Sequence, residues 1–157
     1  MASKRSNDGG HGSPRPTVYR GIEMRSRLEA LVAGYLDEHG FKWDYEPVCF
    51  AGRMGQYLPD FRIQQSGQPN VFVEVKPKPR NLTELMREQV PRMSVIWESE
   101  PGARLIIALC TGYPTPHILP VTGDPASQVF RWNLDDLDEA IRGEWWTEDP
   151  ATASDGG

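Results

Sequence analysis

The sequence predicts a mixed fold of helices and strands, of the α/β (α+β) class. Helical hydrophobic spacing occurs over Gly21–His39 and again from about Thr83. Two short runs rich in Val, Ile, Phe and Tyr, Tyr57–Ile63 and Val71–Lys76, flank a polar turn segment, which is typical of a β-hairpin. The continuous apolar run Ala103–Cys110 indicates a strand that is buried on both faces.

The first helix is predicted over Gly21–His39, and Gly40 is the expected C-terminal stop. At about 100° per residue, Glu29 falls at the edge of the apolar face and Glu23 on the far side. Glu29 is therefore the better candidate for a functional site, and the alternative is an exposed ion pair with Arg25 four residues earlier. The residues expected to be buried on this helix are Leu31, Val32, Tyr35 and Leu36.

The first strand is predicted over Trp43–Phe50, and the glycine-containing segment Ala51–Gln56 is the expected turn to the second strand. The third strand should end at Pro77–Arg80, because its prolines cannot donate backbone hydrogen bonds. A second helix is expected from about Thr83, and Pro91 should kink or split it. Its buried stripe comprises Leu82, Leu85, Met86, Gln89, Val90, Met93 and Trp97.

The hairpin is expected to fold symmetrically about Gly67, which places Asp60 opposite Glu74. Lys76 follows Glu74 by two residues and therefore shares its face. Facing like charges destabilise paired strands, and a divalent cation such as Mg²⁺ between the two acids would offset this repulsion. Lys76 would then activate a water or steady a phosphate. The alternative is a surface hairpin in which Lys76 neutralises two exposed carboxylates.

Pro59-Asp60 followed by Glu74-Val75-Lys76 resembles the signature of the PD-(D/E)XK nuclease superfamily. This superfamily includes type II restriction enzymes, Holliday-junction resolvases and phage recombination nucleases, and the match covers roughly residues 19–111. The resemblance implies a restriction-endonuclease-like core that runs helix, three-stranded antiparallel meander, helix, strand. In that core a central mixed sheet is flanked by helices.

The resemblance also implies the role of each site residue. Asp60 and Glu74 would hold Mg²⁺ or Mn²⁺, and the backbone carbonyl of Val75 would complete the protein ligands. Glu29 would support the metal directly or through a water. Lys76 would position the attacking water or help to deprotonate it, and would offset charge on the phosphate.

Net charge is −5, but basic residues gather beside the expected site. Lys76–Arg92 contains five basic and two acidic residues, which suits weak, salt-sensitive contact with a phosphate backbone. Gln89 lies within the apolar stripe of the second helix, where the superfamily often presents a polar residue to the site. The alternative for Gln89 is a buried side chain bonded to backbone. The expected DNA-binding residues are Lys78, Arg80, Arg87 and Arg25.

The function expected from these residues is a Mg²⁺- or Mn²⁺-dependent deoxyribonuclease that hydrolyses phosphodiester bonds, directed by DNA structure or ends. One alternative is a catalytically inactive nuclease-fold module for DNA binding or assembly. Another is a metal-dependent enzyme that acts on RNA or nucleotides. A homodimer is left open, with Trp145-Trp146 as either an exposed anchor or part of the core packing.

One domain is expected over residues 18–148, between disordered tails at 1–17 and 149–157 that are polar and rich in Gly, Ser and Pro. The acidic segment Asp135–Glu139 is expected on the solvated face of a short helix over Leu134–Arg142. Apolar runs are all shorter than the roughly 20 residues of a membrane span. No signal-peptide pattern occurs, so a phage or bacterial protein of the cytoplasm is expected.

Overall fold

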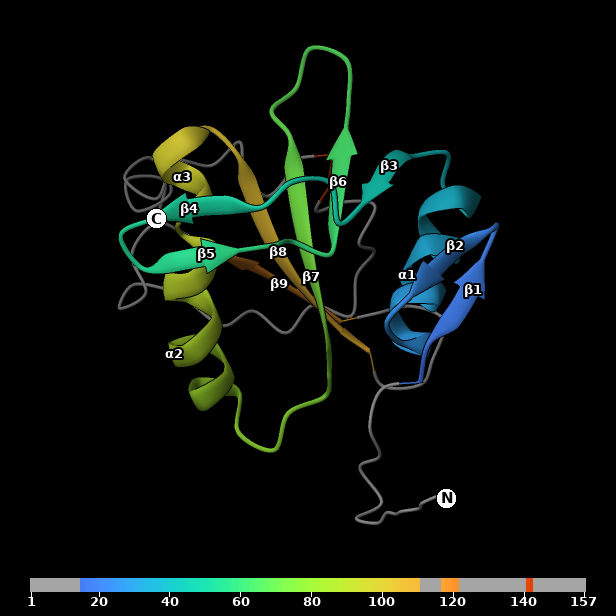
Figure 1. Ribbon diagram of the computed structural model, residues 1–157, viewed down its shortest axis with the longest axis horizontal. Helices are drawn as coiled ribbons and strands as arrows, with labels where there is room; N and C mark the ends of the chain where they lie inside the picture. The colour runs from blue at the N-terminus through green and yellow to red at the C-terminus, as the bar shows by residue number, and fades with distance from the viewer. Residues whose placement is uncertain (1–14, 111–116, 122–140, 143–157) are drawn as a thin grey trace, which may run out of the picture.

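The computed structural model describes residues 15–110, 117–121 and 141–142, and its centre is a five-stranded mixed sheet (Figure 1). Strands β7 and β8 pair in parallel, and the other neighbours in the sheet are antiparallel. The sheet confirms the predicted mixed α+β class, and helices flank it. In spatial order its strands are β3 (Lys42–Tyr45), β6 (Phe61–Gln64), β7 (Val71–Pro77), β8 (Arg104–Cys110) and β9 (His117–Val121).

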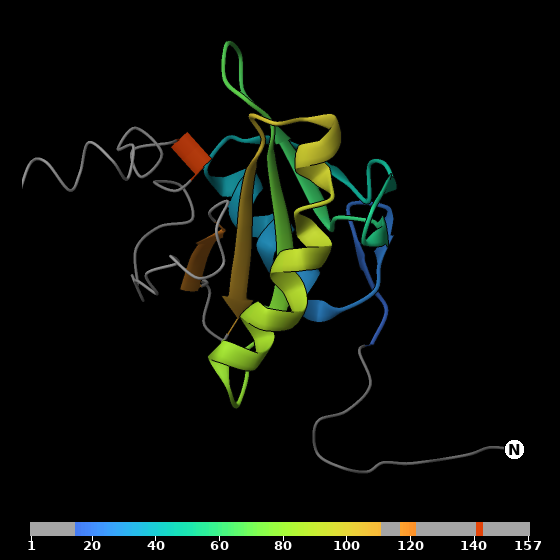
Figure 2. The ribbon, with the colours of Figure 1, turned by 90° about the vertical axis from the view of Figure 1, so that its left-hand side faces the viewer.

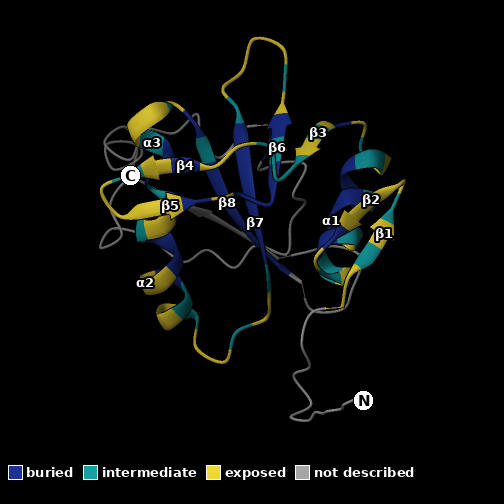
Figure 3. Cartoon of the chain, viewed as in Figure 1, coloured by how far each residue is buried: buried dark blue, intermediate teal, exposed yellow. Residues whose placement is uncertain are grey.

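Helix α1 (Arg27–Glu38) covers one face of the sheet, and α2 (Leu82–Met93) with α3 (Ile96–Ser99) covers the other (Figures 1 and 2). Side chains of β7 alternate between the two layers: Val73 packs with the α1 cluster and Phe72 with the α2 cluster. Figure 3 shows the central strands buried along their length. This double burial explains why β7 and β8 read as nearly continuous apolar runs.

The predicted hairpin register is confirmed. In the β6–β7 pair, Phe61 lies opposite Val73 and Ile63 opposite Val71, as expected for symmetry about Gly67. Gly67 has φ of 72°, which glycine adopts without a steric cost. Extending this register by one residue places Asp60 beside Glu74, at the point where the ladder ends.

The prediction of one strand over Trp43–Phe50 is wrong, because the chain turns after β3. Glu46 has φ of 45°, and Pro47 has no N–H for a ladder bond. The following residues form a separate hairpin of β4 (Phe50–Gly52) and β5 (Gly55–Tyr57). This hairpin lies against α3 and α2, so Tyr57 enters the site from outside the central sheet.

The start predicted for the first helix is also wrong. Residues 21–24 belong to a short hairpin of β1 (Thr17–Tyr19) and β2 (Ile22–Met24), which turns at Arg20-Gly21 with positive φ at both residues. Helix α1 begins at Arg27, because the side chain of Ser26 caps it by accepting a hydrogen bond from the backbone N–H of Glu29.

Burial along α1 follows the prediction with one exception. Val32, Tyr35 and Leu36 are buried, whereas Leu31 is 46% exposed. Glu29 is buried, as its helical angle predicted, and Glu23 is exposed on β2, outside the helix. The side chain that the sequence singled out on this helix therefore faces the protein interior.

The second helix also follows the expected outline. Helix α2 continues through Pro91 to Met93, and α3 begins at Ile96, so the break comes shortly after the proline. The predicted stripe lies inward, with Met86, Val90 and Met93 buried in the α2 cluster.

Several predictions fall on residues that the structure does not describe. They include residues 1–14 of the predicted tail at 1–17, the tail at 149–157, the acidic segment Asp135–Glu139 and the pair Trp145-Trp146. Residues 15–17 of the first tail are described, and Thr17 already belongs to β1. Of the expected helix over residues 134–142, only Ile141 and Arg142 are described, and both are helical. Among the described residues, no helix combines the length and the apolar character needed to cross a membrane.

Candidate active site

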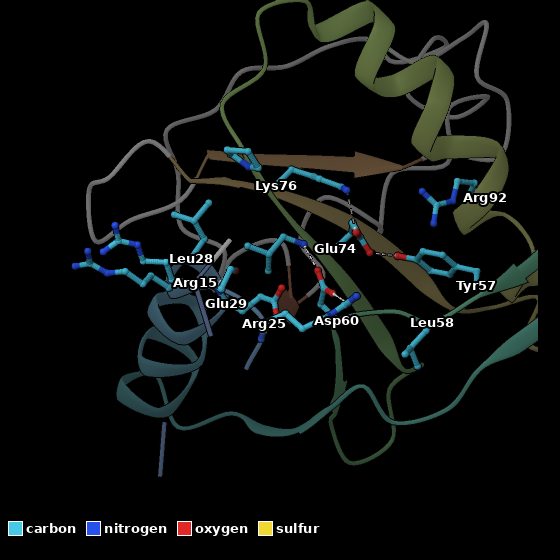
Figure 4. Close-up of a pocket in the computed structure, with 14 residues that line it drawn as sticks. Arg15, Arg25, Leu28, Glu29, Tyr57, Leu58, Asp60, Glu74, Lys76 and Arg92 are labelled. Carbon is cyan, nitrogen blue, oxygen red and sulfur yellow. Dashed lines mark hydrogen bonds and ion pairs between the residues drawn. The ribbon is translucent and has the colours of Figure 1, made fainter. Parts of the chain in front are cut away.

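A cleft of about 680 Å³ lies between the start of α1, the ends of β5 and β7, and the far end of α2 (Figure 4). The acidic residues that the sequence predicted as catalytic all reach it, and so does the predicted lysine. Its lining consists of Arg15, Arg25, Ser26, Arg27, Leu28, Glu29, Tyr57, Leu58, Asp60, Glu74, Val75, Lys76, Pro77 and Arg92.

Asp60 lies directly before β6 and is only 2% exposed. Its Oδ2 accepts a hydrogen bond of 2.7 Å from the backbone N–H of Val75, and its Oδ1 lies 3.0 Å from Nη2 of Arg25. Burial, together with the charge of Glu74, raises the pKa of Asp60 to about 8, although the Val75 N–H and Arg25 partly oppose this rise. Asp60 is thus a buried acid whose charge the protein alone does not fully compensate.

Glu74 is also buried, and each of its two oxygens has a different partner. Its Oε1 accepts a hydrogen bond from the hydroxyl of Tyr57, and its Oε2 lies 3.5 Å from Nζ of Lys76. Burial raises the pKa of Glu74, while the Tyr57 hydrogen bond and the charges of Lys76 and Arg92 lower it. Because Glu74 and Asp60 are both buried, the alternative of an exposed surface hairpin is wrong.

Tyr57 is a site residue that the sequence reading did not single out. It is buried, and burial and the charge of Glu74 raise its pKa well above the ordinary value, so its hydroxyl stays protonated and donates. The guanidinium of Arg92 lies 5.9 Å from the centre of its ring. Tyr57 therefore links α2 to the acidic pair.

Glu29 lies in the first turn of α1 and is buried beside the same cleft. Its Oε1 accepts hydrogen bonds from the hydroxyl of Tyr45 and from the backbone N–H of Arg25. Its charge also contributes to the raised pKa of Asp60. The alternative of an exposed Arg25–Glu29 ion pair is wrong, because the Arg25 side chain pairs with Asp60 and Glu46 instead.

The cations that line the cleft differ from most of those predicted to bind DNA. Of the predicted set, only Arg25 lines it. Lys78 and Arg80 lie on the loop after β7, and Arg87 lies on the exposed side of α2. The cleft instead gains Arg15, Arg27 and Arg92. Arg92 could have been found in the sequence, since it closes the basic segment that begins at Lys76.

Gln89 lies apart from this group. It is 2% exposed and is absent from the lining of the cleft. Its Oε1 has no hydrogen-bond partner among the described residues, so the structure supplies neither a site contact nor a backbone bond for that atom. A role for Gln89 at the site remains a prediction.

The donor set fits a hard divalent cation. All the candidate ligands are oxygens, from Asp60, Glu74, Glu29 and the Val75 carbonyl, and Mg²⁺ and Mn²⁺ favour such ligands. Within the described part of the chain, no three His, Cys, Asp or Glu side chains converge closely enough to hold an ion by themselves. A cation here would need the carbonyl, waters or substrate oxygens in addition, which is the usual arrangement for Mg²⁺.

No protein-family model matches the sequence, and no curated protein matches it significantly. Among solved structures, an XisH family protein from Nostoc punctiforme PCC 73102 is similar with a TM-score of 0.44 and 15% identity, over 52% of this chain and 67% of that one. An fdxN element excision controlling factor protein from Anabaena variabilis is similar with a TM-score of 0.43 and 17% identity, over the same shares of the two chains. Likeness at this level supports no argument about function.

Proposed function

We propose that the protein is a metal-dependent nuclease that hydrolyses phosphodiester bonds in DNA. The observation that carries the proposal is the buried pair Asp60 and Glu74, which lies with Lys76 on the wall of a cleft bordered by arginines. A fold gains no stability from two acids whose pKa values are both raised by burial, with the pKa of Asp60 raised further by the charge of Glu74. A bound cation, together with a substrate phosphate, would explain why two acids are buried side by side.

Two further observations support this choice of chemistry. The sequence order of the acids and the lysine resembles the PD-(D/E)XK signature, and the surrounding order of helix, meander, helix and strand agrees with that core. Arg15 and Arg92 lie on opposite sides of the acidic pair (Figure 4), which suits a polyanion that passes over it.

In the proposed mechanism Asp60 and Glu74 would hold Mg²⁺ or Mn²⁺, with the carbonyl of Val75 as a further ligand and Glu29 in support. When bound, the ion supplies Lewis-acid polarisation of the phosphodiester and a more acidic attacking water. Lys76 lies beside Glu74, where its ammonium group would orient the attacking water and offset charge on the phosphate. Tyr57 keeps Glu74 in place by donating to Oε1, which leaves Oε2 directed toward Lys76.

One observation favours a second candidate, a nuclease-fold module that binds DNA or assembles without catalysis. Each of the two central acids already has a basic partner, Arg25 for Asp60 and Lys76 for Glu74. For this second candidate, the two ion pairs neutralise the acids permanently, and the arginines of the cleft bind DNA without any catalytic role.

A cleavage assay decides between the two candidates. Labelled duplex, branched and single-stranded DNA, and RNA, are each incubated with the full chain with and without Mn²⁺. We expect metal-dependent cleavage of at least one DNA, and no cleavage in EDTA. Binding without cleavage of any substrate would favour the second candidate, and cleavage of RNA alone would replace DNA as the substrate.

Two variants connect any cleavage to this site. Asp60→Asn should abolish it because a ligand charge is lost, and Lys76→Met should lower the rate about 100-fold or more while Mn²⁺ binding persists. Lys42→Met, which removes the same charge from an exposed position of β3 outside the cleft, is the matched control and should cleave like the parent. Parent-like cleavage by Asp60→Asn would rule out the proposed centre.

A further inference from the structure

Arg25, Glu46 and Asp60 form a closed ring of contacts at the edge of the cleft. The Nε of Arg25 lies 2.9 Å from Oε2 of Glu46, and its Nη2 lies 3.0 Å from Oδ1 of Asp60. The backbone N–H of Glu46 donates a 2.8 Å hydrogen bond to the carbonyl oxygen of Asp60, which completes the ring. The guanidinium of Arg25 is therefore in direct contact with Asp60, which we propose as a ligand of the divalent cation.

Glu46 is held in an unusual backbone conformation to make these contacts. Its φ of 45° falls in the left-handed region, which is sterically unfavourable for a residue with a Cβ. Such conformations persist where the surroundings impose them, and they concentrate at functional sites. In this conformation the backbone N–H of Glu46 donates to Asp60 and the side chain of Glu46 contacts Arg25.

Fold stability gives a weak explanation for this arrangement. The Arg25 side chain is 61% exposed, and exposed ion pairs contribute little to stability. Asp60, in contrast, is buried and also accepts a hydrogen bond from Val75. Arg25 is thus a solvent-accessible cation beside a buried acid, and it can leave Asp60 without a large penalty once another cation neutralises that acid.

We propose that Arg25 exchanges partners during the reaction: it pairs with Asp60 while the cation site is empty, and with a substrate phosphate once a divalent cation is bound. This inference rests on the proposed function for the identity of the cation and of the phosphate. Glu46 keeps its contact with Nε in both states, so that Arg25 pivots instead of leaving the cleft. Glu46 is therefore a positioning residue.

The chemistry of the guanidinium suits this exchange. Arginine has five N–H donors in a rigid fork, so Nε can stay on Glu46 while the Nη groups change partner. A cation at Asp60 repels the guanidinium and takes over its neutralising role. A phosphate beside that cation offers the oxygens that arginine binds in a bidentate manner. Cation and DNA then strengthen each other's binding, because both favour the same position of Arg25.

The first test measures cation binding without DNA. Mn²⁺ is titrated into the parent, Arg25→Ala and Arg27→Ala by calorimetry at pH 8. Because the guanidinium competes with the ion for Asp60, Arg25→Ala should bind Mn²⁺ about threefold to tenfold more tightly than the parent. Arg27 lines the same cleft, but among the described residues the guanidinium that pairs with Asp60 is that of Arg25, so Arg27→Ala, which loses an equal charge, should stay within about twofold.

Equal or weaker Mn²⁺ binding by Arg25→Ala would overturn the exchange, since Arg25 would then support Asp60 and not compete for it. A parent protein that binds no Mn²⁺ would overturn it as well. Circular dichroism verifies that each variant is folded, and Glu46→Gln provides a second variant if Arg25→Ala does not fold.

The second test measures the coupling to DNA. Fluorescence anisotropy of a short labelled duplex is recorded with and without Ca²⁺, over times too short for cleavage. Ca²⁺ should tighten DNA binding by the parent about threefold or more beyond its effect on Arg25→Ala. Glu46→Gln should lose the same gain, and the double variant should lose no more than either single change. Equal gains in all four proteins would overturn the roles of both residues.

These two tests of the Arg25 exchange are independent of the test of nuclease activity. Neither titration requires cleavage, so a protein that binds cation and DNA cooperatively through Arg25 but cleaves nothing would refute the activity alone. Conversely, cleavage with an unchanged Mn²⁺ affinity in Arg25→Ala would refute the exchange alone.

Discussion

Two tyrosine hydroxyls hold the two glutamates of the site. Tyr57 donates to Oε1 of Glu74, and Tyr45 donates to Oε1 of Glu29. In both cases the second carboxylate oxygen is left for other partners. Partners that orient a ligand in this way commonly affect metal affinity or activity about 10- to 100-fold.

Tyr57→Phe should therefore lower cleavage about 10- to 100-fold, because Glu74 loses the donor that orients it. The buried Oε1 also loses a hydrogen bond that lowers the pKa of Glu74, so Mn²⁺ binding should weaken. The stability cost should be about 1 kcal/mol. Initial cleavage rates, Mn²⁺ calorimetry and urea unfolding measure the three effects.

Tyr19→Phe is the matched control for this change. The Tyr19 hydroxyl donates to Oδ2 of Asp37 at 2.6 Å, outside the cleft, so the variant loses the same type of bond. It should lose similar stability and keep parent-like cleavage. If both variants lost cleavage in proportion to stability, Tyr57 would be a residue of the fold alone.

At the scale of elements, the sequence predicted correctly those features that depend on residues close together in the chain. The hairpin register followed from one polar turn and two alternating strands, and it correctly placed Asp60 near Glu74. The break at Glu46-Pro47 was missed because the β-prone residues on either side read as one run. The proline was a usable signal, since it cannot donate to a ladder.

The start of α1 could also have been found. Ser26 and Glu29 have the spacing of a capping box, and Ser26 does cap the helix. The Arg20-Gly21 turn and the contacts of Tyr57, by contrast, depend on which elements pack together. The hydroxyl of Tyr57 reaches Glu74 only because the β4–β5 hairpin packs against α2 and α3. This packing cannot be predicted from the spacing of residues in the sequence.

The β4–β5 hairpin is fixed in place by a close contact at Gly52. A Cβ on this residue would lie 2.3 Å from Oε2 of Glu98 and 2.9 Å from Cγ1 of Val95, both near α3. Gly52→Ala should thus destabilise the protein by about 1–3 kcal/mol, because the hairpin must move away from α3. Urea unfolding measures the change.

Gly102→Ala provides the control for Gly52→Ala, since a Cβ there meets nothing within 4 Å. It should leave stability nearly unchanged. In a Glu98→Ala background the cost of Gly52→Ala should shrink, because one of the two clashing groups is gone. An unchanged cost in that background would assign the whole effect to Val95 or to the backbone.

At the scale of the whole molecule, charge is unevenly distributed. The chain has a net charge of −5, yet the cleft is lined by Arg15, Arg25, Arg27, Lys76 and Arg92. Local positive potential attracts a polyanion even to an acidic protein, and such attraction weakens with salt. The buried acids lie at the centre of this positive rim.

Those acids make the stability of the whole protein depend on pH. Burial and the charge of Glu74 raise the pKa of Asp60 to about 8, and burial raises the pKa of Glu74. Between about pH 4, where an unfolded carboxyl loses its proton, and pH 8, the folded state therefore holds more protons than the unfolded one. Without a divalent cation, the melting temperature should consequently fall as pH rises from 5 to 8.

Mg²⁺ should reverse that fall, because a cation binds the deprotonated acids and stabilises the folded state only. The rise in melting temperature on adding saturating Mg²⁺ should thus be larger at pH 8 than at pH 5. Asp60→Asn should flatten both trends, since it removes the carboxyl with the strongly raised pKa. Scanning calorimetry at the two pH values, with Mg²⁺ or with EDTA, measures all three effects. A parent protein that gains equally from Mg²⁺ at both pH values would show that the ion binds away from Asp60.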